Sequence, residues 1–122
     1  MSIKLKRVYD PPTPDDGQRF LADRLWPRGL KKEEAHLAGW LRELAPSDEL
    51  RRWFGHEASH WAEFQRRYKA ELETPEKERL LRELAEKAQA GTVTLVFAAK
   101  DNEHNNALVL KEILQRRQDS SS

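Results

Sequence analysis

The sequence contains no cysteine among its 122 residues. This absence excludes a disulfide framework, a thiolate metal site and a cysteine nucleophile, and it fits a reducing compartment. The chain also lacks any run of about 18 apolar residues, the length needed to span a bilayer. Its N-terminal segment, MSIKLKRVYD, has no apolar stretch of the kind found in signal peptides. We therefore expect a cytoplasmic protein with no membrane partner.

The apolar residues form a modest share of the chain, but they suffice for one hydrophobic core. They make up 38% of the sequence against 35% charged residues, and four Trp and four Phe supply bulk for packing. A chain of 122 residues is too short for two independently stable units. We expect one domain at residues 1–116 and a disordered polar tail at residues 117–122, in a monomer or a homodimer.

Positive charge is concentrated in the first quarter of the sequence. The net charge is only +1, yet residues 1–32 contain eight Lys and Arg against four Asp. Such an excess attracts phosphate groups or other anions, although a mosaic of surface charges is its commoner meaning.

Three segments have the composition of β-strands. Residues 2–9 alternate apolar and polar side chains, residues 19–26 are mostly apolar, and residues 92–99 are β-branched and continuously apolar. The last pattern is typical of a strand buried on both faces, so this strand should be central. The proline-rich loop between the first two strands is shorter than a usual parallel crossover, which leaves their relative direction open.

Helical signals follow the second strand and close the sequence. Cap residues predict three helices, which begin after Ser47, Ser59 and Thr74, and apolar spacing predicts a last helix over residues 107–117.

A weaker helical signal lies within residues 30–46. The residues spaced as on one helical face are Leu37, Trp40, Leu41 and Leu44, with Gly39 among them. Together, the strands and helices predict an α/β fold. We expect a compact domain with a small, mostly parallel sheet of about three or more strands, flanked by helices.

Ligands in open α/β folds bind at the carboxyl edge of the sheet, where strands end and helices begin. Two loops qualify, DRLWPRGLKK after the second strand and AAKDNEHNNA after the buried strand, and the end of the first strand adds to them. Arginine beside a rigid Trp-Pro turn suits a planar or phosphorylated ligand. The candidate ligand-binding residues are Arg7, Tyr9, Arg24, Trp26, Arg28 and Lys100. The candidates for proton transfer in this region are His104 and Asp101.

Each loop also has a purely structural interpretation. In the first loop, Trp26 would fill the edge of the core and Arg24 would pair with an acid. In KDNEHNN, an Asx cap would start the last helix, and a cap needs only one of these polar residues. Both interpretations stay open beside the functional ones.

The segments KRVYDPP, DGQRFLADRLWPRGLKK and FAAKDNEHNNALVL resemble the short, YeaO-like branch of the family called domain of unknown function 488. The resemblance extends over most of the chain, from Ile3 to Leu114. It implies a compact α/β fold with a site at the two loops, in a family whose activity was not established.

The chain departs from longer relatives of that family in the loop after the buried strand. Those relatives carry a Cys-His pair at positions that align with Asn105 and Asn106, so the resemblance implies a binding role for the two asparagines and no thiol chemistry. An asparagine side chain donates and accepts hydrogen bonds but does not titrate. Any catalytic base would therefore be His104, Asp101 or Asp23.

The segment FGHEASHWAEF carries His56, Glu57 and His60 in the H-E-x-x-H spacing of zinc hydrolases. Two histidines four apart on a helix chelate one zinc ion while the glutamate acts as general base. However, Gly55 directly precedes the motif and Ser59 is a helix cap inside it, so the first histidine need not be helical. A zinc hydrolase is kept as a remote alternative, and we expect no metal and no cofactor.

The leading hypothesis is a basic pocket that binds a small anionic ligand of nucleotide or phosphate type, with catalysis left open. The alternative is a nucleic-acid-binding module that uses the basic first quarter against backbone phosphates. Its residues would be Lys4, Lys6, Arg7, Arg28, Lys31 and Lys32. A third interpretation is an interaction module with Trp53 and Trp61 on a dimer face.

Overall fold

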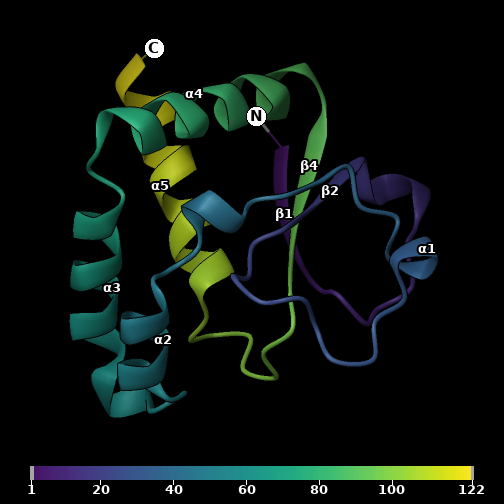
Figure 1. Cartoon of the computed structure of the whole chain (residues 1–122). Helices are drawn as coiled ribbons and strands as arrows, with labels where there is room; N and C mark the ends of the chain where they lie inside the picture. The colour runs from purple at the N-terminus through teal and green to yellow at the C-terminus, as the bar shows by residue number, and fades with distance from the viewer. Residues whose placement is uncertain (1, 122) are drawn as a thin grey trace.

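A four-stranded parallel sheet forms the centre of the molecule (Figure 1). The computed structural model describes the backbone of residues 2–121 and the side chains of residues 2–117. The strands are β1 (Ser2–Arg7), β2 (Gln18–Leu21), β3 (Gly39–Trp40) and β4 (Thr92–Phe97). Their order in the sheet is β1-β4-β2-β3, and all neighbouring pairs are parallel. The predicted α/β fold with a small parallel sheet is confirmed.

β4 is the central strand, as its composition predicts. Leu95 of β4 pairs with Leu5 of β1 on one side and with Phe20 of β2 on the other. Residues 93–97 of the strand are all buried. A β-branched, apolar segment is stable here because both faces of the strand are covered.

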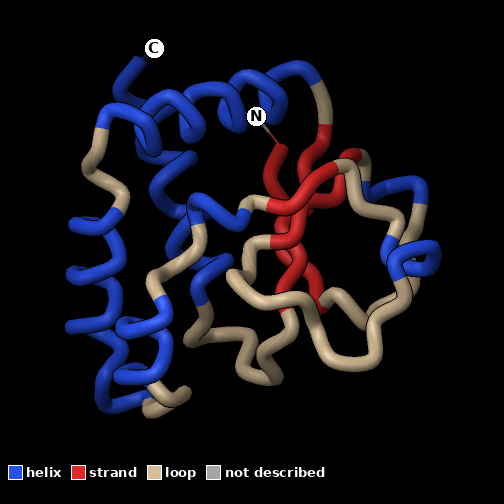
Figure 2. Tube along the Cα trace, in the orientation of Figure 1, coloured by secondary structure: helices blue, strands red, loops and turns tan. Residues whose placement is uncertain are grey.

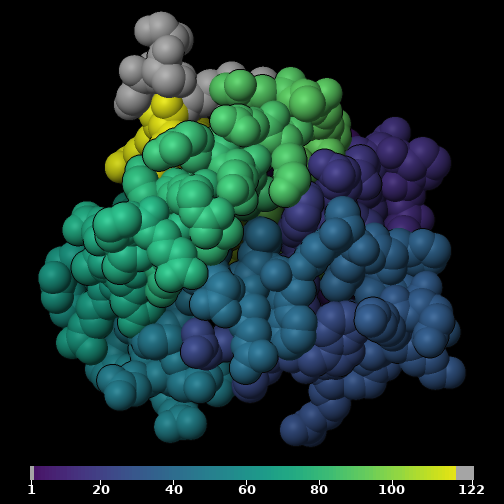
Figure 3. Space-filling model, turned by 45° about the horizontal axis from the view of Figure 1, so that its top comes forward, coloured from purple at the N-terminus to yellow at the C-terminus, as the bar shows by residue number. Residues whose placement is uncertain are grey.

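The two faces of the sheet are covered by different material. One face packs its apolar side chains against α4 (Pro75–Ala90) and α5 (Asn106–Ser121), with α2 (Asp48–Phe54) and α3 (Trp61–Glu71) beyond them (Figure 2). The opposite face is covered by loops, by the short helix α1 (Lys32–Ala35) and by the 3-10 helix η1 (Pro14–Asp16). In the space-filling view, the purple N-terminal residues and the teal helix α3 form opposite flanks (Figure 3).

β1 and β2 are parallel without being neighbours, because β4 lies between them. The short connection at residues 8–17 therefore crosses over β4, on the loop-covered face. At the crossing, the Thr94 hydroxyl of β4 donates a hydrogen bond to the Asp16 carbonyl oxygen at 2.7 Å. Gly17 fits there because a Cβ would lie 2.2 Å from the Thr92 carbonyl oxygen. β1 and β2 therefore run in the same direction, a point that the sequence leaves open.

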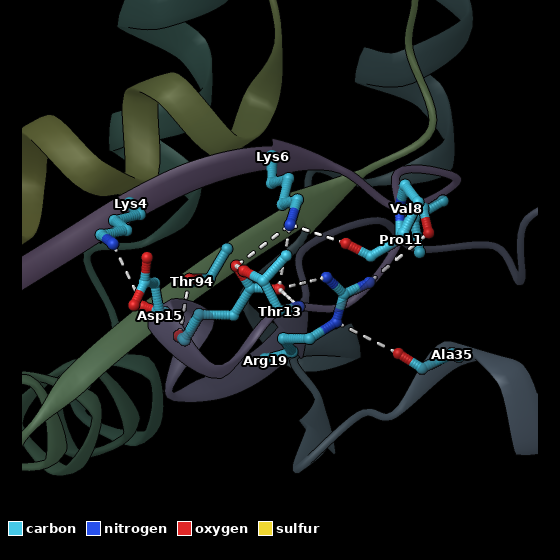
Figure 4. Close-up of polar contacts among 10 residues, drawn as sticks. Lys4, Lys6, Val8, Pro11, Thr13, Asp15, Arg19, Ala35 and Thr94 are labelled. Carbon is cyan, nitrogen blue, oxygen red and sulfur yellow. Dashed lines mark hydrogen bonds and ion pairs between the residues drawn. The ribbon is translucent and has the colours of Figure 1, made fainter.

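A buried ion pair holds the crossing in place (Figure 4). The side chains of Asp16 and Arg19 are almost fully buried, and Arg19 Nη1 lies 2.8 Å from Asp16 Oδ2. Lys6 Nζ lies 3.1 Å from Asp16 Oδ1, and the Thr13 hydroxyl donates to the same oxygen. Burial raises the pKa of Asp16, but these hydrogen bonds outweigh it and hold the pKa well below its usual range.

Most of the capped helices form as predicted. The Ser47 hydroxyl accepts a hydrogen bond from the Leu50 amide at the start of α2, and the Thr74 hydroxyl accepts one from Lys77 at the start of α4. Gly55, with a φ of 52°, ends α2 in the left-handed conformation. The predicted cap at Ser59 is wrong, because a 3-10 turn, η3 (Ala58–His60), leads into α3 without a side-chain cap.

A continuous helix within residues 30–46 is wrong, because the segment is broken around Gly39, the alternative that this glycine leaves open. In this segment α1 is the one α-helix among the described residues, and it is followed by β3 and by the 3-10 turn η2 (Arg42–Leu44). The backbone of this segment pairs with β2 instead, since the Leu41 amide donates to the Leu21 carbonyl oxygen at 2.8 Å. Gly39 permits the close approach, because a Cβ would lie 3.1 Å from the Phe20 ring. Sheet pairing therefore outweighs the helical spacing.

The second and last predicted elements differ in length from the structure. β2 ends at Leu21 rather than at residue 26. α5 continues through Ser121, beyond the expected domain end at residue 116, and Ser122 lies outside the described residues. The division into a domain and a tail stays a prediction. No helix in the described chain has the length and apolar character to cross a membrane.

We expect Asp16→Asn to lower the free energy of unfolding by about 3–5 kcal/mol, because it leaves the buried Arg19 guanidinium without its ionic partner. Since the folded-state pKa of Asp16 is lowered, its contribution is complete above the unfolded-state pKa of about 3.9 and is lost as the pH falls through the folded-state value. Denaturant unfolding of the wild type and the variant at several pH values measures both effects.

Asp15→Asn provides the matched control, because this neighbouring carboxylate is exposed. We expect it to change the free energy of unfolding by less than about 0.5 kcal/mol. A similar loss in both variants would contradict the assigned role of Asp16.

Candidate functional site

A cavity of about 510 Å³ opens at the carboxyl ends of β2 and β4. Its wall is formed by the loop after β2, the loop after β4, the end of α2, and Phe64 of α3. The two loops and the end of α2 lie at the bottom of Figure 1. The polar and charged residues of the wall are Asp23, Arg24, Arg28, Arg51, Arg52, His56, His104, Asn105 and Asn106. The volume is in the range of sites for small molecules.

The wall carries a large excess of positive charge. It contains four arginines and two histidines, whereas Asp23 is the only acid among the described residues that form it. Arg24 and Arg51 share an ion pair with Asp48, at 3.5 and 3.6 Å. The exposed guanidinium groups of Arg28 and Arg52 make no hydrogen bond or ion pair with any described residue. These two arginines are therefore available to an anion.

Asp23 connects three elements at the inner part of the cavity wall. Its Oδ2 accepts a hydrogen bond from the Ala98 amide at 2.9 Å, and its Oδ1 accepts one from Asn106 Nδ2 at 3.3 Å. Burial raises the pKa of this carboxyl, while the hydrogen bonds from Ala98 and Asn106 and the nearby charge of His56 partly offset the rise. No arginine forms an ion pair with Asp23 among the described side chains.

His104 is held by Asp101 in the loop after β4. The ring Nδ1 of His104 lies 2.9 Å from Asp101 Oδ2, and its ring meets Trp61 edge to face at 5.3 Å. Hydrogen bonds from the Glu103 backbone and then from the His104 side chain lower the pKa of Asp101. Asp101 itself does not form part of the wall. The pair orients the imidazole at the cavity, where it could exchange a proton.

The two asparagines make hydrogen bonds within the protein. Asn105 caps α5, since its Oδ1 accepts from the Leu108 amide at 2.9 Å while its Nδ2 donates to the Asp101 carbonyl oxygen. Asn106 Nδ2 donates to the Ala22 carbonyl oxygen at 2.8 Å. The Asx cap considered for this loop is thus formed by Asn105, and the predicted ligand contacts of both residues stay predictions.

Trp26 lies on the cavity wall at the protein surface. Its side chain is 36% exposed, its Nε1 donates to the Leu30 carbonyl oxygen at 2.8 Å, and its ring meets Trp40 edge to face at 5.6 Å. The ring is therefore fixed while it remains accessible, which is compatible with stacking on a planar ligand.

Three predicted binding residues do not line the cavity, namely Arg7, Tyr9 and Lys100. Arg7 donates hydrogen bonds to the carbonyl oxygens of Ala98 and Ala99, and the Tyr9 hydroxyl donates to that of Arg28. Both residues thus brace the loops that form the wall. Lys100 is exposed.

The contribution of α2 to the cavity is not evident from the sequence. Arg51, Arg52 and His56 reach the cavity because α2 ends beside it. In the sequence, the two arginines fit the solvent face of a helix, and the only local signal is the helix end at Gly55. Placing that end against the sheet requires tertiary packing that no local pattern encodes.

The residues proposed for nucleic-acid binding are divided in the structure. Lys4 donates to the Asp15 carbonyl oxygen, and Lys6 and Arg7 also bind groups within the protein. Lys31 and Lys32 are exposed on and beside α1. The nucleic-acid interpretation stays a prediction with fewer free cations than the sequence suggests. Trp53 and Trp61, proposed for a dimer face, are both half-buried against the core.

The H-E-x-x-H segment is not a metalloprotease helix. His56 has a left-handed φ of 60°, outside α2, and His60 lies in the 3-10 turn before α3. The His60 ring stacks on Trp53 at 4.3 Å, and its Nδ1 lies 3.2 Å from the Trp53 carbonyl oxygen. Within the described residues, no three His, Asp or Glu side chains come together as a metal site.

Comparison with known proteins gives a family and several relatives. The family DUF488-N3i, described as the inactive DUF488-N3 subclade, matches residues 2–122. The uncharacterized protein YeaO of Escherichia coli strain K12 is 45% identical over 94% of this chain and 98% of its own. The uncharacterized proteins Mb3100c of Mycobacterium bovis and Rv3073c of Mycobacterium tuberculosis are each 37% identical over 94% of this chain and 95% of theirs. No solved structure matches the chain.

We expect His60→Ala to lower the free energy of unfolding by about 0.5–1.5 kcal/mol, because it removes the stacking on Trp53. Thermal unfolding of untagged protein, with and without a chelator, measures this loss. It should be the same in both conditions if His60 only packs. Stoichiometric zinc that disappears in the variant would instead establish a metal role.

Proposed function

Because the chain belongs to the DUF488-N3i family, the inactive DUF488-N3 subclade, we propose that it binds a small anionic ligand of nucleotide or phosphate type without converting it. The cavity at the ends of β2 and β4 is the binding site. The observation that carries the proposal is the charge of the cavity wall, whose described residues include four arginines and one acid. Arginine binds phosphate oxygens through two parallel N–H groups, so such a wall favours anions.

The chemistry of the wall supports binding over catalysis. None of the wall residues, all within the described part of the chain, carries a thiol, a hydroxyl or a primary amine. Of the groups that act as covalent nucleophiles in enzymes, the described wall therefore offers only the Asp23 carboxylate and two imidazoles. The Asp101–His104 pair remains as a proton-transfer group, but a base alone does not supply a reaction. We assign His104 to the binding of the anion.

Arg28→Ala should weaken the binding of inorganic pyrophosphate about 10- to 100-fold, because a hydrogen bond to a charged group contributes about 1.5–3 kcal/mol. Titration calorimetry of the wild type and the variant measures this effect. The fold should be unaffected, since the Arg28 guanidinium is exposed and has no partner among the described residues.

Arg82→Ala is the matched control, because Arg82 is also exposed but lies on α4, outside the cavity wall. Equal binding by Arg28→Ala and wild type would refute the site. If Arg28→Ala leaves the binding of pyrophosphate unchanged but weakens that of a DNA or RNA oligonucleotide, and the latter falls steeply with salt, the nucleic-acid alternative would replace the proposal.

Sulfate should bind more tightly as the pH falls from about 8 to about 4, since protonation of Asp23 removes a negative charge from the wall. Burial raises the pKa of Asp23, the only acid among the described wall residues, so this carboxylate loses its negative charge at a higher pH than an ordinary Asp does. Sulfate is the suitable probe because it keeps its own charge throughout this range.

In Asp23→Asn, the rise in sulfate affinity should be smaller, and the affinity at the higher pH should be greater than in the wild type. Calorimetric titration at several pH values tests both expectations. A sulfate affinity that does not depend on pH in the wild type would contradict this account of the cavity.

A further inference from the structure

We propose that the cavity selects a phosphorylated heteroaromatic ring that presents two adjacent N–H donors, as guanine does, to the carboxylate of Asp23. This inference rests on the proposed anion-binding function and specifies the rest of the ligand. The arginines would bind the anionic group of the ligand, and the Asp23 carboxylate would accept hydrogen bonds from the N–H groups of its ring. The carboxylate of Asp23 lies in the cavity wall, where a site that bound only anions would not need an acid.

Asp23 has acceptor capacity that the protein does not fill. A carboxylate offers about four acceptor positions. The described residues occupy two of them, with one hydrogen bond to each oxygen, from Ala98 and from Asn106. The neighbouring Arg24 pairs with Asp48 instead. One position therefore remains on each oxygen, which is the arrangement that a pair of adjacent N–H donors matches.

The wall around Asp23 suits a flat, partly apolar ring. Its apolar members are Leu25, Trp26, Pro27, Pro46, Phe54, Phe64, Ala98 and Ala99. Phe54 and Phe64 stack on each other at 4.4 Å, and Trp26 supplies an indole ring at the outer edge. An anion such as phosphate alone gains nothing from this surface, whereas a heterocycle buries it. The wall thus combines an apolar slot, one acceptor group and several cations.

Asp23 also has a structural role, because it connects the ends of β2 and β4 with the start of α5. A test must therefore separate recognition from folding. The two effects of its charge provide this separation: the carboxylate repels a plain anion but attracts a ring that donates N–H groups. Loss of the charge should consequently change the two affinities in opposite directions, which a general loss of structure cannot do.

The experiment compares guanosine, inosine and adenosine monophosphates with inorganic pyrophosphate by titration calorimetry. Inosine monophosphate lacks the exocyclic amino group, and adenosine monophosphate also lacks the ring N–H. We expect the affinity of the wild type to fall about 10-fold or more from guanosine to inosine monophosphate, and to fall further from inosine to adenosine monophosphate. In Asp23→Asn, guanosine monophosphate should bind about 10-fold more weakly, whereas pyrophosphate should bind at least as tightly as in the wild type.

Asp10→Asn is the matched control, since this acid is exposed and does not line the cavity. It should leave all four affinities unchanged. If Asp23→Asn does not fold, the series of three nucleotides on the wild type decides alone. Equal affinity for the three nucleotides would overturn this inference and leave anion binding intact, whereas no binding of pyrophosphate or any nucleotide would overturn the proposed function with it.

Discussion

The passage of the first connection over β4 is the constraint on which the structure depends. β4 separates β1 from β2, so the short segment between those strands crosses the sheet and buries the Asp16 carboxylate there. Buried backbone groups and charges need partners, and the Asp16–Arg19 pair, Lys6 and the Thr94 hydroxyl supply them. With the crossing fixed, β2 runs parallel to β4, and the loops after both strands lie at one edge of the sheet.

The sequence predicts those elements whose cause is local. Caps at Ser47 and Thr74 and the apolar run of β4 are local signals, and each forms as predicted. The prediction fails at residues 37–44, because their backbone pairs with β2 and this pairing depends on a strand far away in the sequence. For the same reason, the sequence indicates the two loops that line the cavity but not the arginines at the end of α2. The H-E-x-x-H spacing misleads because Gly55 interrupts the helix on which the motif would depend.

The loop after β4 suggests how a site can keep its shape without reactive groups. The resemblance to longer relatives places a Cys-His pair at Asn105 and Asn106. Here Asn105 caps α5 and Asn106 joins that helix to the end of β2, so both positions serve the junction between strand and helix. An asparagine performs these tasks with its amide alone. The junction that forms the cavity wall therefore does not depend on a nucleophile.

The charges of the cavity wall are unfavourable for stability alone. Arg28 and Arg52 have no ionic partner among the described residues, and Asp23, on the same cavity wall, has none either. A surface selected only for stability would place acids beside Arg28 and Arg52, and an apolar or amide side chain at the position of Asp23. Departures from local consistency of this kind concentrate at functional sites, where stability is given up for binding. The unfilled acceptors of Asp23 and the guanidinium groups of Arg28 and Arg52 are the features on which the proposed ligand rests, anionic at one end and N–H-donating at the other.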